Sequence, residues 1–187
     1  PIKDHFATLT ILNCIGRMAA RAKNICEETA FVVSGETKSP KVYQVLFVDE
    51  SDDALTQLAV TYAKRAYPQS GRYASAGWKP ASRIDQRCEI FLKRKGFDVG
   101  GVHPTGLVTL RDQLDTTHVV VSLGGDPREH LGEVPFRTVV LEWDLGVAPH
   151  DLDQERAEAA LESAFRELQA ELGDLDRKCS NFPSPPK

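Results

Sequence analysis

The feature that most constrains the fold is a short apolar run, Val45-Leu46-Phe47-Val48, that leads directly into an acidic loop. The run predicts a buried parallel strand, and the pattern beyond the loop predicts a helix. A loop of this kind often binds phosphate, because its backbone N–H groups and the helix dipole favour an anion. Here, however, no Lys or Arg occurs before Lys64, and four residues are acidic: Asp49, Glu50, Asp52 and Asp53. The backbone pattern therefore favours an anion that the side chains repel.

Composition excludes several classes of protein. The 187 residues are 41% hydrophobic and 27% charged, which is typical of a globular domain with a real core. A net charge of −4 gives no electrostatic footprint for nucleic acid. No run approaches the ~18 apolar residues of a membrane-spanning helix, and no signal peptide is visible. The four cysteines form no CxxC pair, so we expect a reduced, cytoplasmic protein without a cofactor.

The N-terminal segment has a helical pattern. Apolar residues recur at three- and four-residue steps from Asp4 to Val33, and Gly35 is a plausible stop. A helix of roughly 30 residues would be about 45 Å long. Its apolar stripe needs a partner, which is the rest of the chain, a second copy or residues upstream. We therefore expect self-association through this helix, and a homo-oligomer.

From Val42 onward, predicted strands alternate with predicted helices. The strands are expected at 43–48, 72–76, 118–123 and 137–143, and the helices at 53–67, 82–95, 108–114 and 153–172. This alternation predicts an α/β domain in which a four-stranded parallel sheet has helices on both faces. Ligands of such sheets bind at the carboxyl ends of the strands, where the acidic loop begins. The expected organisation is a helix and linker over 1–40, an α/β domain over 41–173 and a flexible tail over 174–187.

The order of short motifs over residues 42–173 resembles the low-molecular-weight protein tyrosine phosphatase superfamily and its related arsenate reductases. The matching segments are the strand 45–48 with Thr56-Gln57, then Tyr73-Ala74-Ser75-Ala76-Gly77, Gly96-Phe97-Asp98, the strand 119–123 ending in Gly125-Asp126, and Trp143-Asp144. The resemblance implies the same phosphatase-like α/β fold as the alternation of strands and helices.

The resemblance also implies which residues occupy the phosphate loop, and the reactive ones are missing. The nucleophilic Cys of the family's Cys-x5-Arg motif falls on Asp49, and the arginine falls on Leu55. The general acid falls at 147–148, where no acid stands, and the further cysteines of the arsenate reductases fall near Gly124 and Leu131. Ser75 and Asp144 remain as accessory residues. The degenerate loop consists of Asp49, Glu50, Ser51, Asp52, Asp53, Ala54, Leu55 and Thr56.

The N-terminal segment resembles the closing helix of the PhoU family of phosphate-uptake regulators. The matching residues are Asn24, Ile25, Glu27, Glu28 and Gly35-Glu36. The acidic residues that bind metal in PhoU proteins fall on Gly16 and Ala20, so the resemblance implies the helix without its metal site. It also implies a role in phosphate-uptake regulation.

Three interpretations of the acidic loop stay open. It is a solvated turn in which Asp52 or Asp53 caps the next helix, a partner-binding or regulatory surface, or a divalent-cation site built on Asp49 and Asp52. The function that we expect is that of a catalytically inactive, phosphatase-like regulatory or binding protein, although an enzyme is not excluded. The alternatives are a metal-dependent phosphohydrolase that uses Asp49, or a phosphatase or arsenate reductase relative with residual activity.

Overall fold

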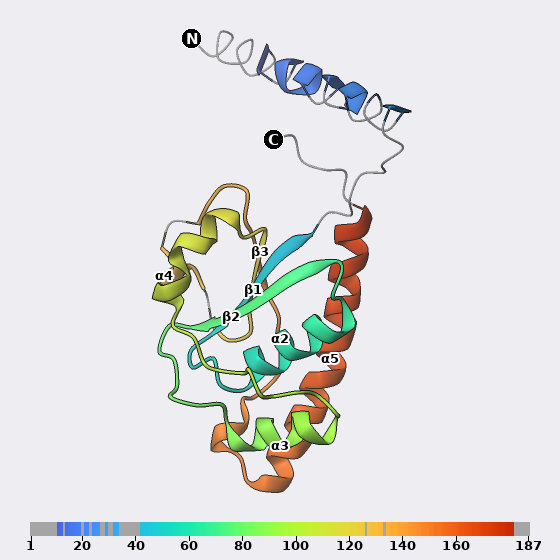
Figure 1. The fold of residues 1–187 in the computed structure, drawn as a ribbon. Coiled ribbons are helices and arrows are strands. Elements are labelled where there is room, and N and C mark those ends of the chain that lie inside the picture. The colour runs from blue at the N-terminus through green and yellow to red at the C-terminus, as the bar shows by residue number, and fades with distance from the viewer. Residues whose placement is uncertain are drawn as a thin grey trace. The chain divides into compact units, whose positions relative to one another are not determined.

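Four parallel strands form a single sheet in the order β2-β1-β3-β4 (Figure 1). They are β1 (Tyr43–Asp49), β2 (Gly71–Gly77), β3 (Val119–Ser122) and β4 (Val139–Glu142). In the register of the sheet, Val45 of β1 lies opposite Tyr73 of β2 and Val119 of β3. β1 is central because its apolar residues are buried on both faces, as a parallel core strand requires. The predicted four-stranded parallel sheet is confirmed.

The coordinates come from a computed structural model of the chain, which describes residues 42–181 except 126 and 133, together with part of the segment 11–33. Residues 42–181 form one compact unit, and the described residues of 11–33 belong to a second. Those described residues are helical, as the apolar periodicity predicts. The remainder of the predicted N-terminal helix and the linker lie outside the described residues.

Helices cover both faces of the sheet, as predicted. On one face, α2 (Leu55–Ala66), α3 (Gln86–Arg94) and α5 (Gln154–Asn181) form the larger core with inward side chains of the sheet such as Phe47. On the other face, the 3₁₀ helix η1 (Leu107–Thr116) and the short α4 (Arg128–Leu131) pack on Leu46 and Val48. A further 3₁₀ turn, η2 (Pro149–Asp151), leads into α5. Because alternate residues of β1 enter different cores, both helical layers depend on this strand.

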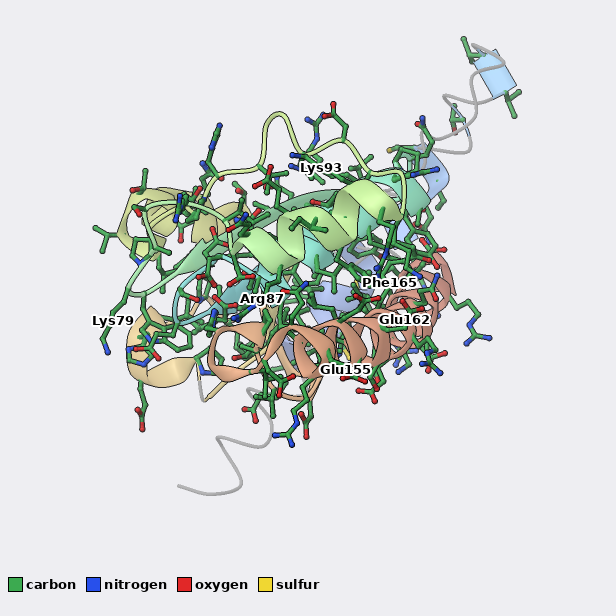
Figure 2. The ribbon with its side chains drawn as sticks, turned by 90° about the horizontal axis from the view of Figure 1, so that it is seen from below. Lys79, Arg87, Lys93, Glu155, Glu162 and Phe165 are labelled. Atoms are coloured by element: carbon green, nitrogen blue, oxygen red, sulfur yellow. The ribbon has the colours of Figure 1, made fainter. Side chains whose placement is uncertain are left out.

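The side chain of Phe165 extends from α5 toward α3 (Figure 2). Its ring makes edge contacts with Phe91 and Tyr62, at centroid distances of 5.9 and 5.3 Å. Outside this aromatic cluster, Lys95 forms an ion pair of 2.9 Å with Glu162. The aromatic contacts carry most of the stabilisation, because a half-exposed ion pair contributes little.

The last helix is longer than the sequence pattern indicates. We expected it to end at Leu172 before Gly173, with a flexible tail from residue 174, but α5 continues to Asn181. The expectation failed for a packing reason: Leu175 continues the buried face, and the Tyr43 hydroxyl donates a hydrogen bond of 3.0 Å to the Cys179 carbonyl. Gly173 is an interior residue of the helix here, not its end. The predicted tail is therefore wrong for residues 174–181, and 182–187 lie outside the described residues.

Among the residues that the structure describes, no helix is both long and apolar enough to cross a membrane.

Candidate functional site

The acidic loop 49–56 connects the end of β1 to α2 and rests on the end of β2. Asp49 lies opposite Gly77 in the sheet register. Beyond that pair, Lys79 N–H donates to the Glu50 carbonyl and Ala81 N–H donates to the Ser51 carbonyl, each at 2.8 Å. The loop backbone is so close to Gly77 that a Cβ there would stand 2.7 Å from the Glu50 oxygen and 2.9 Å from the Asp52 nitrogen. Only a glycine allows this approach.

Asp49 turns its carboxylate into its own loop. Oδ1 accepts a hydrogen bond of 2.6 Å from the Asp52 N–H, and Oδ2 accepts one of 3.1 Å from the Thr56 hydroxyl. Burial raises the pKa of this carboxyl, and the two hydrogen bonds partly oppose that increase. The Asp52 N–H, a backbone donor that could otherwise bind an anion, is thus occupied by the Asp49 side chain of the same loop.

Asp52 is fully buried and adopts a left-handed backbone conformation, with φ of 52°. Its Oδ2 accepts a hydrogen bond of 2.7 Å from Thr105 N–H, whereas Oδ1 has no hydrogen-bond partner among the described residues. Burial raises the pKa of Asp52 from its ordinary 3.8 to about 6, although the Thr105 N–H and the nearby Ser75 and Thr56 hydroxyls favour the ionised form. The site therefore contains a carboxyl group that is half protonated in mildly acid solution.

Gln57 joins the loop to the segment that precedes η1. This residue is buried, and its Nε2 donates to the Asp52 carbonyl at 2.8 Å and to the His103 carbonyl at 3.3 Å. Sequence reasoning missed the roles of Gln57, His103 and Thr105 in the site. The only signal was Gln57 itself, a polar residue at a position that the helical pattern places toward the core.

The other two acids of the loop have partners at the surface. Glu50 is exposed, and its ion pair of 2.7 Å with Lys79 lowers the pKa of Glu50. Asp53 accepts a hydrogen bond from the Ser51 hydroxyl and lies 3.7 Å from His150 Nδ1. Neither Asp52 nor Asp53 caps α2, whose N-cap is Ala54 and has no side-chain hydrogen bond. The interpretation as a solvated, capping turn is therefore wrong, because Asp52 is turned into the interior.

The remaining predicted residues divide into two groups. Ala54 and Leu55 are buried in the larger core, so the position expected for an arginine contributes to packing. Ser75 of β2 lies beside Asp52, as an accessory residue would. Asp144 is exposed and accepts a hydrogen bond from Gly146 N–H, and no described contact links it to the loop. The structure thus brings Ser75 to the site but not Asp144.

Two of the cations near the loop, Lys79 and Arg87, are already engaged. Arg87 of α3 donates hydrogen bonds to the carbonyls of Pro149 and His150, at 2.6 and 3.2 Å. These contacts border a cavity of about 650 Å³ beside the loop, whose charged lining mixes both signs: Asp53, Arg83, Asp85, Arg87 and His150. Within the described part of the chain, no three His, Cys, Asp or Glu residues are grouped so that they could hold a metal ion.

Comparison with known proteins identifies the fold. No protein-family model matches the chain, and no curated protein does. Among solved structures, it is similar to the YwlE arginine phosphatase of Geobacillus stearothermophilus, with a TM-score of 0.62 and 17% identity over 76% of this chain and 98% of that one. The chain is also similar to the thioredoxin-dependent arsenate reductase of Corynebacterium glutamicum, with a TM-score of 0.54 and 22% identity over 79% of this chain and 70% of that one. For the tyrosine phosphatase Wzb of Escherichia coli K30, the TM-score is 0.58 and the identity 12%, over 72% of this chain and 99% of that one. Residues 42–181 therefore have the low-molecular-weight phosphatase and arsenate reductase fold.

The close approach at Gly77 predicts the effect of adding a single methyl group. Gly77→Ala places Cβ against the backbone of Glu50 and Asp52, so the loop must move. We expect a loss of about 1–3 kcal/mol in the free energy of unfolding, measured by urea denaturation. Gly101→Ala is the matched control, because a Cβ there has no neighbour within 4 Å. Equal stability of the two variants would contradict the role given to Gly77.

The raised pKa of Asp52 predicts how stability changes with pH. The folded protein holds this proton more tightly than the unfolded chain does, so stability falls as the pH rises from about 4 to about 6. Asp52→Asn removes the charge, keeps an acceptor for Thr105 N–H and tolerates the left-handed conformation. We expect the variant to match the parent at pH 4 and to exceed it by at most about 3 kcal/mol at pH 8. Glu50→Gln, at an exposed position, should not show this gain.

Proposed function

We propose that this chain is a catalytically inactive, phosphatase-like protein that acts by binding a partner. The observation that carries the proposal is the position of the Asp49 carboxylate, whose oxygens already accept from the Asp52 N–H and the Thr56 hydroxyl. A nucleophile needs an oxygen or sulfur free to attack, and a phosphate needs the loop donors free to bind it. In this loop, the Asp49 side chain occupies one of the donors that a phosphate would need, and each of its own oxygens already accepts a hydrogen bond.

Electrostatics support the same conclusion. A phosphate in the loop would lie close to Asp49, Glu50 and Asp53, and a like-charge pair at 4 Å costs about 4 kcal/mol at an intermediate dielectric. Residue 55 is a buried leucine and offers no guanidinium to offset this repulsion. Lys79 and Arg87 are engaged with Glu50 and with backbone carbonyls, and Arg83 lines the adjacent cavity together with Asp53 and Asp85. Binding of a phosphate ester is therefore unfavourable before any chemistry begins.

Two enzymatic alternatives remain, and turnover of a phosphate ester tests the phosphatase activity of each. A metal-dependent phosphohydrolase could use Asp49, which ends the central strand at the edge where parallel sheets place their ligands. A Mg²⁺ ion would then have to pull this carboxylate away from Thr56. Residual phosphatase or arsenate reductase activity has less support, because Asp49 and Leu55 carry neither a thiol nor a guanidinium.

The proposed setting is phosphate-uptake regulation in the cytoplasm, with the N-terminal helix as the site of self-association. The described residues of 11–33 are helical and expose large apolar side chains, among them Ile15, Met18 and Ile25. An exposed apolar stripe of this kind is typical of a helix that packs on a partner. Together with the PhoU resemblance, it supports a homo-oligomer held by this segment.

Turnover of para-nitrophenyl phosphate tests the absence of catalysis. We expect no hydrolysis above the buffer rate with or without Mg²⁺, and no difference between the parent and Asp49→Asn. The double variant Asp49→Cys with Leu55→Arg, checked for folding by circular dichroism, should bind inorganic phosphate in calorimetry, whereas the parent should not. Mg²⁺-dependent turnover that Asp49→Asn abolishes would establish the phosphohydrolase instead.

Removal of residues 1–38 tests the proposed self-association. We expect the full chain to sediment as an oligomer and the truncated chain to sediment as a monomer, since the apolar stripe is lost. Met18→Asp, within the stripe, should weaken the oligomer, whereas Arg17→Asp on the adjacent face is the control. A full chain that sediments as a monomer at all concentrations contradicts this part of the proposal.

A further inference from the structure

The outer edge of β2 has backbone groups that no described residue pairs with. The strand order places β2 at one edge of the sheet, with β1 on its inner side only. Tyr43 N–H donates to the Ser70 carbonyl, and Trp78 N–H donates to the Asp49 carbonyl. Since successive residues of a strand direct their N–H and C=O groups to opposite edges, the even-numbered residues of β2 face β1. The N–H and C=O groups of Tyr73 and Ser75 consequently point away from the sheet.

This edge is occupied at one end. Gly77 N–H donates a hydrogen bond of 2.8 Å to the Thr105 carbonyl, and Gly77 forms a parallel bridge with Gly106. No described residue forms a hydrogen bond with the outward groups of Tyr73 or Ser75. Among the described residues, a fifth strand is therefore started only at Gly77, by Thr105 and Gly106, and the edge beside Tyr73 and Ser75 stays open.

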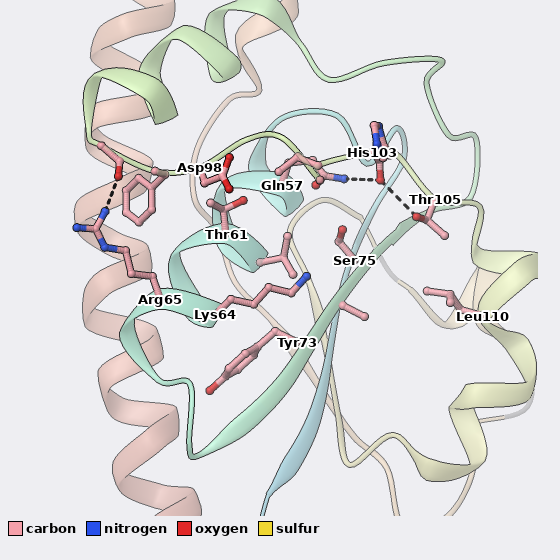
Figure 3. Close-up of a pocket in the computed structure, with 16 residues that line it drawn as sticks. Gln57, Thr61, Lys64, Arg65, Tyr73, Ser75, Asp98, His103, Thr105 and Leu110 are labelled. Carbon is pink, nitrogen blue, oxygen red and sulfur yellow. Dashed lines mark hydrogen bonds between the residues drawn. The ribbon is translucent and has the colours of Figure 1, made fainter.

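Residues 96–105, here called the strap, are held away from the open edge. At one end, Arg65 donates a hydrogen bond of 2.8 Å to the Gly96 carbonyl and stacks over the Phe97 ring at 4.9 Å. At the other end, Gln57 holds the His103 carbonyl. Between the strap, α2 and β2 lies a cavity of about 710 Å³, with Tyr73 and Ser75 in its wall (Figure 3). The edge groups therefore face a preformed space.

The cavity lining contains the ammonium of Lys64, a hydroxyl without a described partner and one carboxylate, Asp98, which accepts a hydrogen bond from Gly100 N–H. Lys64 of α2 extends along the cavity toward β2 (Figure 3), is exposed, and has no ion-pair partner among the described residues. Thr61 Oγ1, one turn earlier, is buried and has no hydrogen-bond partner in the described part of the chain. Arg72 is exposed on β2 itself. This basic edge belongs to a chain whose net charge is −4.

We propose that the open edge of β2 binds an extended, acidic segment of a partner protein, which adds to the sheet as a fifth strand. The main-chain groups of Tyr73 and Ser75 would pair with the segment, and alternate side chains would enter the cavity, where an acidic residue meets Lys64. The open stretch of β2 from Gly71 to Ser75 is five residues long, roughly 17 Å of strand. Binding at this edge does not require the 49–56 loop to be active or inactive. Its test is therefore independent of the test for the proposed lack of catalysis.

Residue-resolved amide hydrogen exchange of the full chain tests the proposal. The probe is a capped heptapeptide of alternating Val and Glu. We expect a Kd on the order of 100 μM and more than about tenfold slower exchange at the Tyr73 and Ser75 amides. A heptapeptide of the same sequence with every backbone amide N-methylated has no N–H to offer from either edge, cannot pair as a strand and should not protect them.

Charge is tested with matched variants. Lys64→Glu should weaken binding of the Val/Glu heptapeptide about tenfold, whereas Arg156→Glu on α5, outside the cavity, should leave it unchanged. Tight binding of the N-methylated peptide, or equal binding of a Val/Lys heptapeptide, overturns the proposal. Protection of both amides without peptide, appearing only as the protein dimerises, also overturns it, because the occupant is then a second copy.

Discussion

The hydrogen bond from Thr105 N–H to the buried Asp52 carboxylate organises this end of the molecule. It fixes the loop after β1 to the segment that closes the outer edge of β2, two regions that are 53 residues apart in sequence. Gln57 reinforces the junction by donating to both sides of it. A buried carboxylate is costly without full compensation, and one of its oxygens has no described partner. The left-handed backbone of Asp52 is sparsely populated for a residue other than glycine, and the hydrogen bonds that join this residue to Asp49 and Thr105 hold it.

Under the proposed function, a ligand-binding loop has become a structural one. The turn, the glycine beneath it and the Thr56 hydroxyl then enclose an anion that the loop itself supplies. The anion here is Asp49, which is covalently attached and always at the site. Under the proposed function, this tethered carboxylate competes with free anions at an effective concentration far above theirs. Hydrogen bonds that would bind an anion in an open loop therefore stabilise the folded conformation of this one.

The fold could be predicted from sequence because it follows from local patterns. The apolar run 45–48, the alternation of strands and helices and the motif order determine a four-stranded parallel sheet. The acidic loop could be located but not described. Whether Asp52 faces water or the interior depends on the backbone turn at that residue and on Thr105, which no periodicity connects to it. The end of α5 was missed for a similar reason: its last turns are fixed by packing of Leu175 and by the distant Tyr43, which outweigh the glycine at position 173.

The hydrogen bond between Tyr43 and Cys179 has a consequence for how this unit can be combined with others. It joins the first residue of β1 to the last turn of α5, so the chain enters and leaves the α/β unit at neighbouring points. A unit with adjacent ends can be inserted into a surface loop of another protein without stretching either connection. It can also be circularly permuted by a short linker. The α/β unit can therefore be joined to different flanking segments without a change in its own fold.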